Sequence, residues 1–326
     1  MSLDRAAEFI KSHKKFLVAA HMNLDGDALG SELAFARLVR GLGKSCAVIN
    51  DESVPYGHEF LPGVSSIVRF GKNSGRIHAD SFVALDCSDL SRTGPVHTLA
   101  AGLPVLNIDH HISNGRFGAV NWVEPGACCT CELIYALYKK LKVPIDRQAA
   151  LQLYTGILTD TGSFRYSNTS PLTHRIAAEL LSLGVHASDV YKKIYSSIPY
   201  DDLRLLAQIL STMRRDAGGK VIWFQLTKEL MKGRNSLSFD LSESILNFAR
   251  SVKGAQVAVL FKENLDRRNE IRVNFRSQGH VDVNAVAGIF GGGGHRTAAG
   301  ATVKKPLARV RSLVLAALRS NLERKR

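Results

Sequence analysis

One imidazole and two carboxylates fall within seven residues near the N-terminus: His21, Asp25 and Asp27. Gly26 separates the two aspartates and lets the backbone turn sharply between them. Carboxylates this close repel one another unless a cation lies between them, and mixed nitrogen and oxygen ligands suit manganese, zinc or iron. The segment therefore predicts a divalent metal site. The alternative is a polar loop in which Asp27 is simply the N-cap of the following helix.

Two further aspartates stand at the ends of apolar runs. Asp86 follows the run at residues 81–85, where a turn or a helix cap is the simpler explanation. Asp160 ends an apolar helical segment, and the dipole at the end of a helix disfavours an anion that has no partner. A bound metal would compensate the charge of Asp160 at that position.

The triplet Asp109-His110-His111 follows another apolar run, at residues 105–108. A lone histidine is more often structural, but two adjacent histidines after a carboxylate are hard to explain by packing. Together, the four polar segments form a group sized for two metal ions that share a bridging carboxylate. Such an arrangement hydrolyses phosphate esters.

The apolar pattern predicts how these segments come together. The runs at residues 16–20, 45–49, 81–85 and 105–108 are typical of buried strands, and residues 28–42 have the apolar spacing of a helix. Short buried strands that alternate with helical segments indicate a parallel sheet with helices on both faces. Ligands bind at the carboxyl edge of such a sheet, which is where the polar segments fall.

A second, strand-rich region follows a mostly helical stretch. Strands are expected at residues 220–226, 255–261 and 271–275, all in an antiparallel arrangement in which the last two form a hairpin, and a helix is expected at 307–322. We therefore predict an α/β protein in two parts. Residues 1–195 form a domain with a parallel sheet and the metal site, residues 196–217 form a connecting helix, and residues 218–326 form a smaller α+β domain.

The charge of the chain indicates an anionic partner. Its 326 residues include 43 Lys and Arg against 29 Asp and Glu, a formal net charge of +14. Such an excess suits a nucleic acid, a nucleotide, another phosphate compound or a membrane surface. Half of it falls on residues 304–326, which hold eight basic side chains and one acidic one. The hydrophobic content of 45% excludes a disordered chain.

The cysteines and apolar runs predict a cytoplasmic protein. Five cysteines at this low density are not a disulfide framework. Three of them, Cys128, Cys129 and Cys131, lack the distant second pair of a zinc site and are expected to be small residues that open a helix. No uncharged apolar run approaches the roughly 18 residues of a transmembrane helix, and the run at residues 16–20 is too short for a signal peptide.

The sequence resembles the DHH phosphoesterase family, which is named after the triplet found here at residues 109–111. The four polar segments match the family's four N-terminal motifs in order. The run at residues 290–300, with four glycines before His295, resembles the signature of the associated DHHA1 domain. The most similar subgroup is the stand-alone bacterial oligoribonucleases that also act on 3′-phosphoadenosine 5′-phosphate (pAp). The resemblance thus implies hydrolysis of short RNA oligonucleotides to mononucleotides and of pAp to AMP.

The resemblance also implies two divalent ions, expected to be Mn²⁺, that share Asp86 as a bridging ligand. The ligands carried over are His21, Asp25 and Asp86 for one ion, and Asp27, Asp86, His110 and Asp160 for the other. His111 would face the scissile phosphate, and Asp109 would orient a histidine rather than bind metal. The implied catalytic residues are therefore His111, Asp109 and Asp86.

A second set of residues is expected to contact the substrate. Its members are Arg92, Asn114, Arg272, Arg276, Ser277, Gly293, Gly294 and His295. Glycines let backbone N–H groups approach a phosphate closely, and His295 would add a charge-assisted contact. Arg272 and Arg276 lie four residues apart on one strand and so share a face. The alternatives are a flexible glycine turn and two solvated arginines.

Other functions stay open at this point. The runner-up is a phosphodiesterase for cyclic di-AMP or its linear dinucleotide product. A pyrophosphatase is less favoured, because family members with that activity carry a different C-terminal domain. A protein that binds RNA without hydrolysing it is a non-enzymatic alternative, and the complete ligand set argues against it. No membrane partner is expected. The oligomeric state is open, although related proteins are commonly dimers.

Overall fold

The structure is a computed structural model that describes residues 2–71, 74, 77–232, 241–279 and 281–323. The chain divides into two compact units, Met1–Ser197 and Ile198–Arg326. Each unit is built around its own sheet, the first parallel and the second mixed. The predicted α/β class, with a parallel N-terminal sheet and a smaller C-terminal domain, is confirmed.

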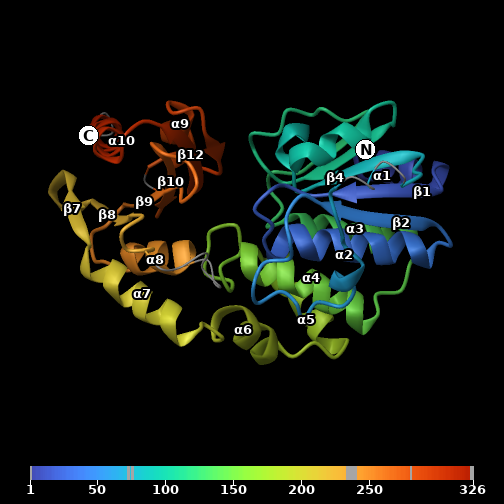
Figure 1. Ribbon diagram of the computed structural model, residues 1–326. Coiled ribbons are helices and arrows are strands. Elements are labelled where there is room, and N and C mark those ends of the chain that lie inside the picture. Colours follow the sequence, from blue (N-terminus) through green and yellow to red (C-terminus); the bar gives the residue numbers. More distant parts are fainter. Residues whose placement is uncertain (1, 72–73, 75–76, 233–240, 280, 324–326) are drawn as a thin grey trace. The chain divides into compact units, whose positions relative to one another are not determined.

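The first unit contains a six-stranded sheet with the order β3-β2-β1-β4-β5-β6, and all neighbours pair in parallel. Its strands are β1 (Lys15–Ala19), β2 (Ser45–Asn50), β3 (Val68–Arg69), β4 (Ser81–Leu85), β5 (Val105–Asp109) and β6 (Val120–Val123). Its helices are α1 (Ser2–Ser12), α2 (Gly26–Gly41), α3 (Thr130–Leu141), α4 (Arg147–Asp160), α5 (Pro171–Ser182) and α6 (Ala187–Tyr195). Figure 1 shows α2, α3 and α4 together beside this sheet.

The two faces of this sheet are covered differently. Helices α1 to α4 contribute to the main hydrophobic core on one face. The other face packs against the 3₁₀ segment Leu90–Ala100 and against apolar residues between positions 70 and 79. Pro95 and the left-handed Gly94 (φ 61°) lie inside that segment and prevent a regular α-helix. Of the two faces that were expected to carry helices, only one carries regular α-helices.

The strand order places the predicted ligands at one point of the sheet. β1 pairs with β2 on one side and with β4 on the other, so the direction of winding reverses at β1. Ala19 of β1 lies in register with Ala84 of β4, so the segments that follow these strands leave the sheet side by side. A crevice forms at such a reversal, outside the carboxyl ends of the strands.

Small residues let α2 and α4 pack closely, so that the first turn of α2 lies against the last turn of α4. A Cβ at Gly26 would collide with Thr159, and one at Gly156 would collide with the Cys131 sulfur and lie 2.8 Å from Asp27 Oδ1. Glycine at these positions therefore brings the start of α2 and the end of α4 to the same edge.

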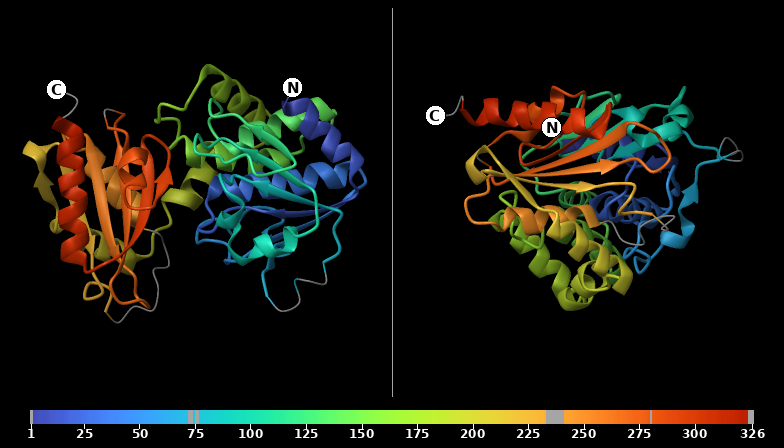
Figure 2. Two further views of the ribbon diagram at one scale, coloured as in Figure 1. Left: turned by 90° about the horizontal axis from the view of Figure 1, so that it is seen from above. Right: turned by 60° about the vertical axis from the view of Figure 1, so that its left-hand side comes forward.

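The second unit contains a mixed sheet with the order β11-β12-β10-β9-β8-β7. Its strands are β7 (Arg214–Asp216), β8 (Val221–Leu226), β9 (Val257–Glu263), β10 (Glu270–Ser277), β11 (Gly293–Gly294) and β12 (Ala298–Lys304). Its helices are α7 (Tyr200–Ser211), α8 (Leu241–Arg250), α9 (Val283–Gly288) and α10 (Leu307–Glu323). Helices α7 and α8 pack on one face of the sheet, and α9 and α10 on the other, as the views in Figure 2 allow the reader to follow.

The expected secondary structure needs correction in one strand direction and in three elements that were missed. The hairpin between β9 and β10 is present, but β8 and β9 pair in parallel, because the chain returns through α8 between them. Sequence reasoning also missed α1, β6 and β12. β12 reads Ala-Ala-Gly-Ala-Thr-Val-Lys, and small residues of this kind give little strand signal before their pairing with β10 is known.

The three clustered cysteines lie at the start of α3. Cys128 precedes the helix, Cys129 is its N-cap and Cys131 is in its first turn, and all three thiols are buried and free.

None of the helices in the described ranges combines the length and the apolar character that a membrane crossing requires.

Gly156→Ala tests the close packing of α4. The added methyl group has no space beside Cys131 and Asp27, so we expect a loss of about 1–3 kcal/mol in the free energy of unfolding. Urea denaturation measures this loss. Gly126→Ala is the matched control, since no atom lies within 4 Å of a Cβ at that position. Equal stabilities of the two variants would contradict the packing argument.

Candidate metal centre

The Asp86 carboxylate is the centre of the site. Asp86 follows β4 with a left-handed backbone (φ 56°), and its N–H donates to the Ile108 carbonyl at 3.0 Å. The residue is 2% exposed, and its Oδ1 accepts a hydrogen bond from the Thr130 hydroxyl at 3.0 Å. Burial alone would raise the pKa of Asp86, but hydrogen bonds from His110 and His21 hold this pKa well below its usual value. Asp86 is therefore a buried carboxylate that stays charged.

His21 and Asp25 complete one group of ligands with Asp86. His21 Nε2 lies 3.2 Å from Asp86 Oδ2 and 3.8 Å from Asp25 Oδ2. His21 Nδ1 lies 2.9 Å from the Met22 carbonyl, which can only accept, so Nδ1 carries a proton and Nε2 is the atom available to a metal. Burial would lower the pKa of His21, but the Asp86 and Asp25 carboxylates raise it to about 9.

Asp25 and Asp27 share the start of α2 but have different tasks. Asp25 is the N-cap, because its Oδ1 accepts hydrogen bonds from the N–H groups of Asp27 and Ala28. The alternative with Asp27 as N-cap is therefore wrong. The Asp27 carboxylate instead accepts hydrogen bonds from the N–H groups of Thr130 and Cys131, at 2.7 and 2.8 Å, at the start of α3. The positive end of the α3 dipole thus holds Asp27 in place.

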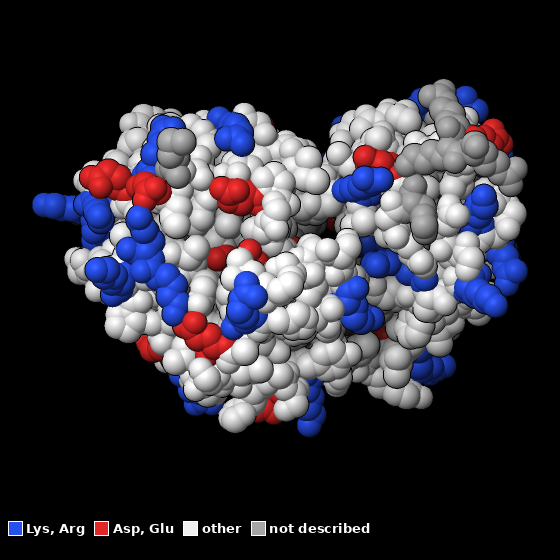
Figure 3. Space-filling model, turned by 180° about the vertical axis from the view of Figure 1, so that it is seen from behind, with Lys and Arg blue, Asp and Glu red and all other residues white. Residues whose placement is uncertain are grey.

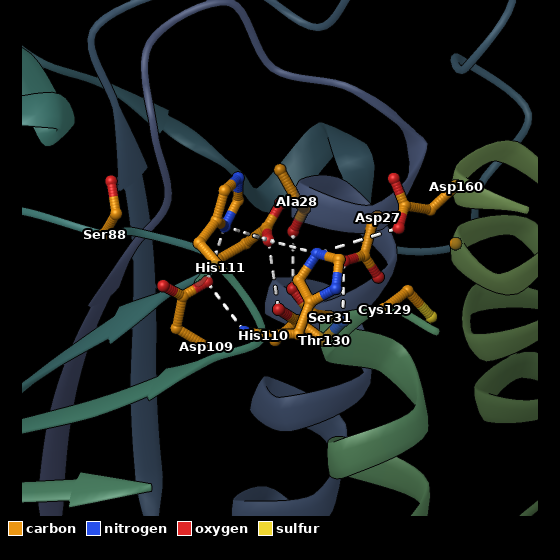
Figure 4. A network of polar contacts seen from close by, with 12 residues as sticks. Asp27, Ala28, Ser31, Ser88, Asp109, His110, His111, Cys129, Thr130 and Asp160 are labelled. Carbon is orange, nitrogen blue, oxygen red and sulfur yellow. Dashed lines mark hydrogen bonds and ion pairs between the residues drawn. The ribbon is translucent and has the colours of Figure 1, made fainter. Parts of the chain in front are cut away.

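A second group of donor atoms surrounds His110. Its Nε2 lies 3.4 Å from Asp86 Oδ1, 3.7 Å from Asp160 Oδ2 and 3.9 Å from Asp27 Oδ2. Figure 4 shows His110, Asp27 and Asp160 directed toward the same space from different elements. The two groups share Asp86, as expected for a bridging ligand. All six predicted ligands are therefore brought together.

The pKa shifts of the second group favour a bound cation. Burial and the nearby Asp86 carboxylate raise the pKa of Asp27 to about 6, and burial also raises the pKa of Asp160 well above its usual value. Burial would lower the pKa of His110, but Asp160 and Asp86 raise it well above its usual value. These shifts favour protons on the cluster, and a divalent cation can replace them.

The donor set fits divalent cations. Imidazole nitrogens and carboxylate oxygens suit Mn²⁺, Fe²⁺ and Zn²⁺. One ligand atom from each of His21, Asp25 and Asp86 lies within 4.8 Å of the others, and the same holds for Asp27, Asp86 and His110. Neighbouring ligands around an octahedral cation lie about 3 Å apart when each is about 2.1 Å from it. Small side-chain adjustments therefore suffice for binding.

His111 has its shortest contact with Asp109, and its Nδ1 also lies 3.6 Å from Asp86 Oδ1. Its Nδ1 lies 2.7 Å from Asp109 Oδ1, and the other carboxylate oxygen of Asp109 accepts a hydrogen bond from Asn114 Nδ2 at 2.6 Å. Burial would raise the pKa of Asp109, but the contact with His111 lowers it. Asp109 therefore holds a proton on Nδ1 of His111.

The other predicted substrate contacts of the first unit are partly engaged within the protein. The Asn114 amide donates to Asp109, to Asn107 Oδ1 and to the Cys87 carbonyl. Arg92 donates to the Ser88 hydroxyl at 3.5 Å, a long contact that leaves most of its guanidinium donors for a ligand.

The substrate contacts predicted in the second unit cluster around β10 and β12. Arg272 and Arg276 lie on one face of β10, as expected. The Ser277 hydroxyl is buried and accepts hydrogen bonds from Gly279 and Val281, so it holds a turn. Gly293 and Gly294 form β11 against β12, and His295 begins the turn to β12 through a hydrogen bond with Ala298.

Sequence reasoning missed two polar residues of the site. Thr130 donates its hydroxyl to Asp86 and its backbone N–H to Asp27. Asn168 donates to the backbone carbonyls of Cys128 and Asp160, and thereby ties the start of α3 to the end of α4. A threonine at the predicted start of a helix was a usable signal, whereas Asn168 stands in a loop with no distinguishing pattern.

This fold and this centre define a phosphoesterase. Residues 15–157 match the N-terminal domain of the DHH family, and residues 218–323 match the DHHA1 domain. The chain belongs to this family of DHH/DHHA1 phosphoesterases, which are hydrolases.

Two relatives are similar to this chain over about nine-tenths of its length. The chain is 33% identical over 317 residues to the bifunctional oligoribonuclease and PAP phosphatase NrnA of Thermus thermophilus, covering 94% of this chain and 90% of the relative. It is 25% identical to the Bacillus subtilis protein of the same name, over 90% of this chain and 91% of that one.

Solved structures agree on the fold. An exopolyphosphatase-related protein from Bacteroides fragilis superposes with a TM-score of 0.89 at 26% identity, covering 99% of this chain and 97% of that one. RecJ from Thermus thermophilus in complex with Mn²⁺ has a TM-score of 0.55 at 14% identity, covering 98% of this chain and 55% of that one. The likeness to RecJ shows the fold alone.

Mn²⁺ binding to the metal-free protein is expected to tighten as the pH rises from 6 to 9. His21, with a pKa of about 9, and Asp27, with a pKa of about 6, must lose protons before they bind a cation. Titration calorimetry in two buffers of different ionisation enthalpy measures both the affinity and the protons released. An affinity that does not change with pH and is not accompanied by proton release would contradict this account.

Thr130→Val is expected to weaken Mn²⁺ binding by about tenfold, because valine keeps the shape but cannot donate to Asp86. Thr155→Val is the matched control, since the buried Thr155 hydroxyl bonds only to the Leu151 carbonyl of its own helix. The same calorimetric titration compares the two variants. Equal Mn²⁺ affinities would show that the hydroxyl of Thr130 does not support the site.

Proposed function

We propose that this protein hydrolyses short oligoribonucleotides to mononucleotides and pAp to AMP, with two Mn²⁺ ions as cofactors. The observation that carries the proposal is the pair of donor groups that share the buried Asp86 carboxylate. A two-ion centre of this kind suits in-line displacement at phosphorus. The printed activities of the Thermus thermophilus and Bacillus subtilis relatives support the choice of substrates.

The mechanism assigns separate tasks to the two kinds of side chain. His21, Asp25, Asp27, Asp86, His110 and Asp160 would hold the cations. Bound cations supply positive charge that stabilises the transferring phosphoryl group. His111 acts as a general acid through Nε2, protonating the leaving oxygen, while Asp109 fixes the proton on Nδ1 and stabilises the charged ring.

We propose that arginine side chains of each unit contact the phosphate groups of the substrate. Arg92 in the first unit and Arg272 and Arg276 on β10 are guanidinium groups suited to phosphate oxygens. The backbone N–H groups of Gly293 and Gly294 are further candidate donors. Figure 3 shows Lys and Arg scattered over the visible face of each unit instead of gathered into one patch.

A substrate panel tests the proposal. With Mn²⁺ present, we expect turnover of pAp and of RNAs of two to five nucleotides, and little or no turnover of pyrophosphate. Initial rates are measured by chromatography of the products. Preferred cleavage of cyclic di-AMP or the linear dinucleotide pApA would favour the runner-up activity. Salt-sensitive RNA binding without any turnover would support the non-enzymatic alternative.

Asp86→Ala ties this activity to the metal centre. The variant loses the carboxylate shared by both donor groups, so turnover and tight Mn²⁺ binding are expected to disappear together. Asp146→Ala is the control, because Asp146 caps the opposite end of α4 from Asp160 and pairs with Arg37 on the surface. Mn²⁺-dependent turnover retained in Asp86→Ala would overturn the assignment.

A further inference from the structure

Asn107 lies two residues before Asp109 of the triplet and is fully buried, yet it is not among the predicted ligands or substrate contacts. Its Nδ2 donates to the Ala84 carbonyl at 3.2 Å and to the Cys87 carbonyl at 3.1 Å. Its Oδ1 accepts a hydrogen bond from Asn114 Nδ2 at 2.8 Å. Because carbonyls only accept, these partners fix which end of the amide faces which neighbour.

The two carbonyls that Asn107 binds lie on either side of Asp86 in the chain. Asp86 has a left-handed backbone (φ 56°), a conformation that is uncommon for residues other than glycine. The Asp86 N–H bonds to β5 through Ile108, and the Asn107 amide binds the chain before and after the residue. Neighbouring residues of β5 therefore clamp the turn that presents Asp86.

The same amide reaches the catalytic histidine through two further contacts. Asn114 donates to both Asn107 Oδ1 and Asp109 Oδ2, and Asp109 Oδ1 in turn faces His111 Nδ1. Asn107 thus stands between the carboxylate that both donor groups share and the carboxylate that orients His111.

We propose that Asn107 is a positioning residue, which holds the Asp86 turn in the geometry that binds two cations. The proposal deepens the proposed function and rests on its two-ion site, but not on the identity of the substrate. Groups that orient metal ligands from behind affect metal affinity about 10- to 100-fold when they are removed. Because the Asn107 side chain contacts carbonyls and Asn114, its effect should appear in Mn²⁺ affinity and in kcat rather than in substrate binding.

Asn121 provides a matched control on the neighbouring strand. It lies in register with Asn107 in the parallel pair β5–β6. Within the described part of the chain, its side chain bonds to the backbone of Gly118, in a turn that bears no predicted ligand. Asn107→Leu and Asn121→Leu therefore remove the same amide from neighbouring positions of the sheet, but only the first removes a donor from the carbonyls on either side of Asp86.

The experiment titrates metal-free wild type, Asn107→Leu and Asn121→Leu with Mn²⁺ and follows the free ion by electron paramagnetic resonance. We expect the dissociation constant to rise at least about tenfold in Asn107→Leu and to stay at the wild-type value in Asn121→Leu. Thermal unfolding of the metal-free proteins shows that each is folded. Asn107→Ser, with a small side chain that admits water, replaces the leucine variant if that variant does not fold.

Kinetics with pAp give the second readout. At saturating Mn²⁺ we expect kcat of the Asn107 variant to fall while KM stays within about twofold of wild type. A folded Asn107 variant that binds Mn²⁺ as tightly as wild type overturns the proposal, as does an equal loss of affinity in Asn121→Leu. If the wild type hydrolyses neither pAp nor short RNA, the proposed function fails, while the Mn²⁺ titration still decides the role of Asn107.

Discussion

The rest of the site depends on keeping the Asp86 carboxylate charged while it is almost completely buried. Removing an unpaired carboxylate from water costs several kcal/mol, so the fold must supply partners. It supplies two imidazoles at 3.2 and 3.4 Å and the Thr130 hydroxyl at 3.0 Å. These partners come from the segments that follow β1 and β5 and from the start of α3. Burial of this one charged carboxylate thus requires three distant parts of the chain to place hydrogen-bond donors beside the end of β4.

The topology makes this convergence possible. The winding of the sheet reverses at β1, so the carboxyl ends of β1, β4 and β5 meet at one edge of the sheet although about 90 residues separate His21 from His110. The glycine contacts between α2 and α4 add Asp27 and Asp160 to the same edge, one from the first turn of a helix and one from the last. A carboxylate at the end of α4 faces an unfavourable dipole. The site thus brings together carboxylates from several elements, and bound cations would balance their charge.

Sequence reasoning identified the candidate ligands that the fold brings together, because the segments that carry them follow apolar runs and their residue types carry the chemistry. The backbone N–H groups of Thr130 and Cys131 that hold Asp27 have no such signature, since every residue except proline offers the same donor. The direction of β9 relative to β8 was also hidden, because it depends on the path of the chain through α8. Asn114 and Ser277 show a related limit. Residue type identifies a polar group, but only the fold shows that Asn114 serves Asp109 and that Ser277 closes a turn.

The net charge of the chain has a different meaning once the site is known. A phosphodiester that approaches Asp25, Asp27, Asp86 and Asp160 meets four carboxylates within one crevice, and a formal charge of +14 on the whole protein does not remove that local repulsion. Half of the basic excess falls on residues 304–326, outside the unit that carries these carboxylates. Two divalent cations bound at the four carboxylates would cancel their charge where the phosphate must bind, so metal loading would control substrate binding as well as the chemical step.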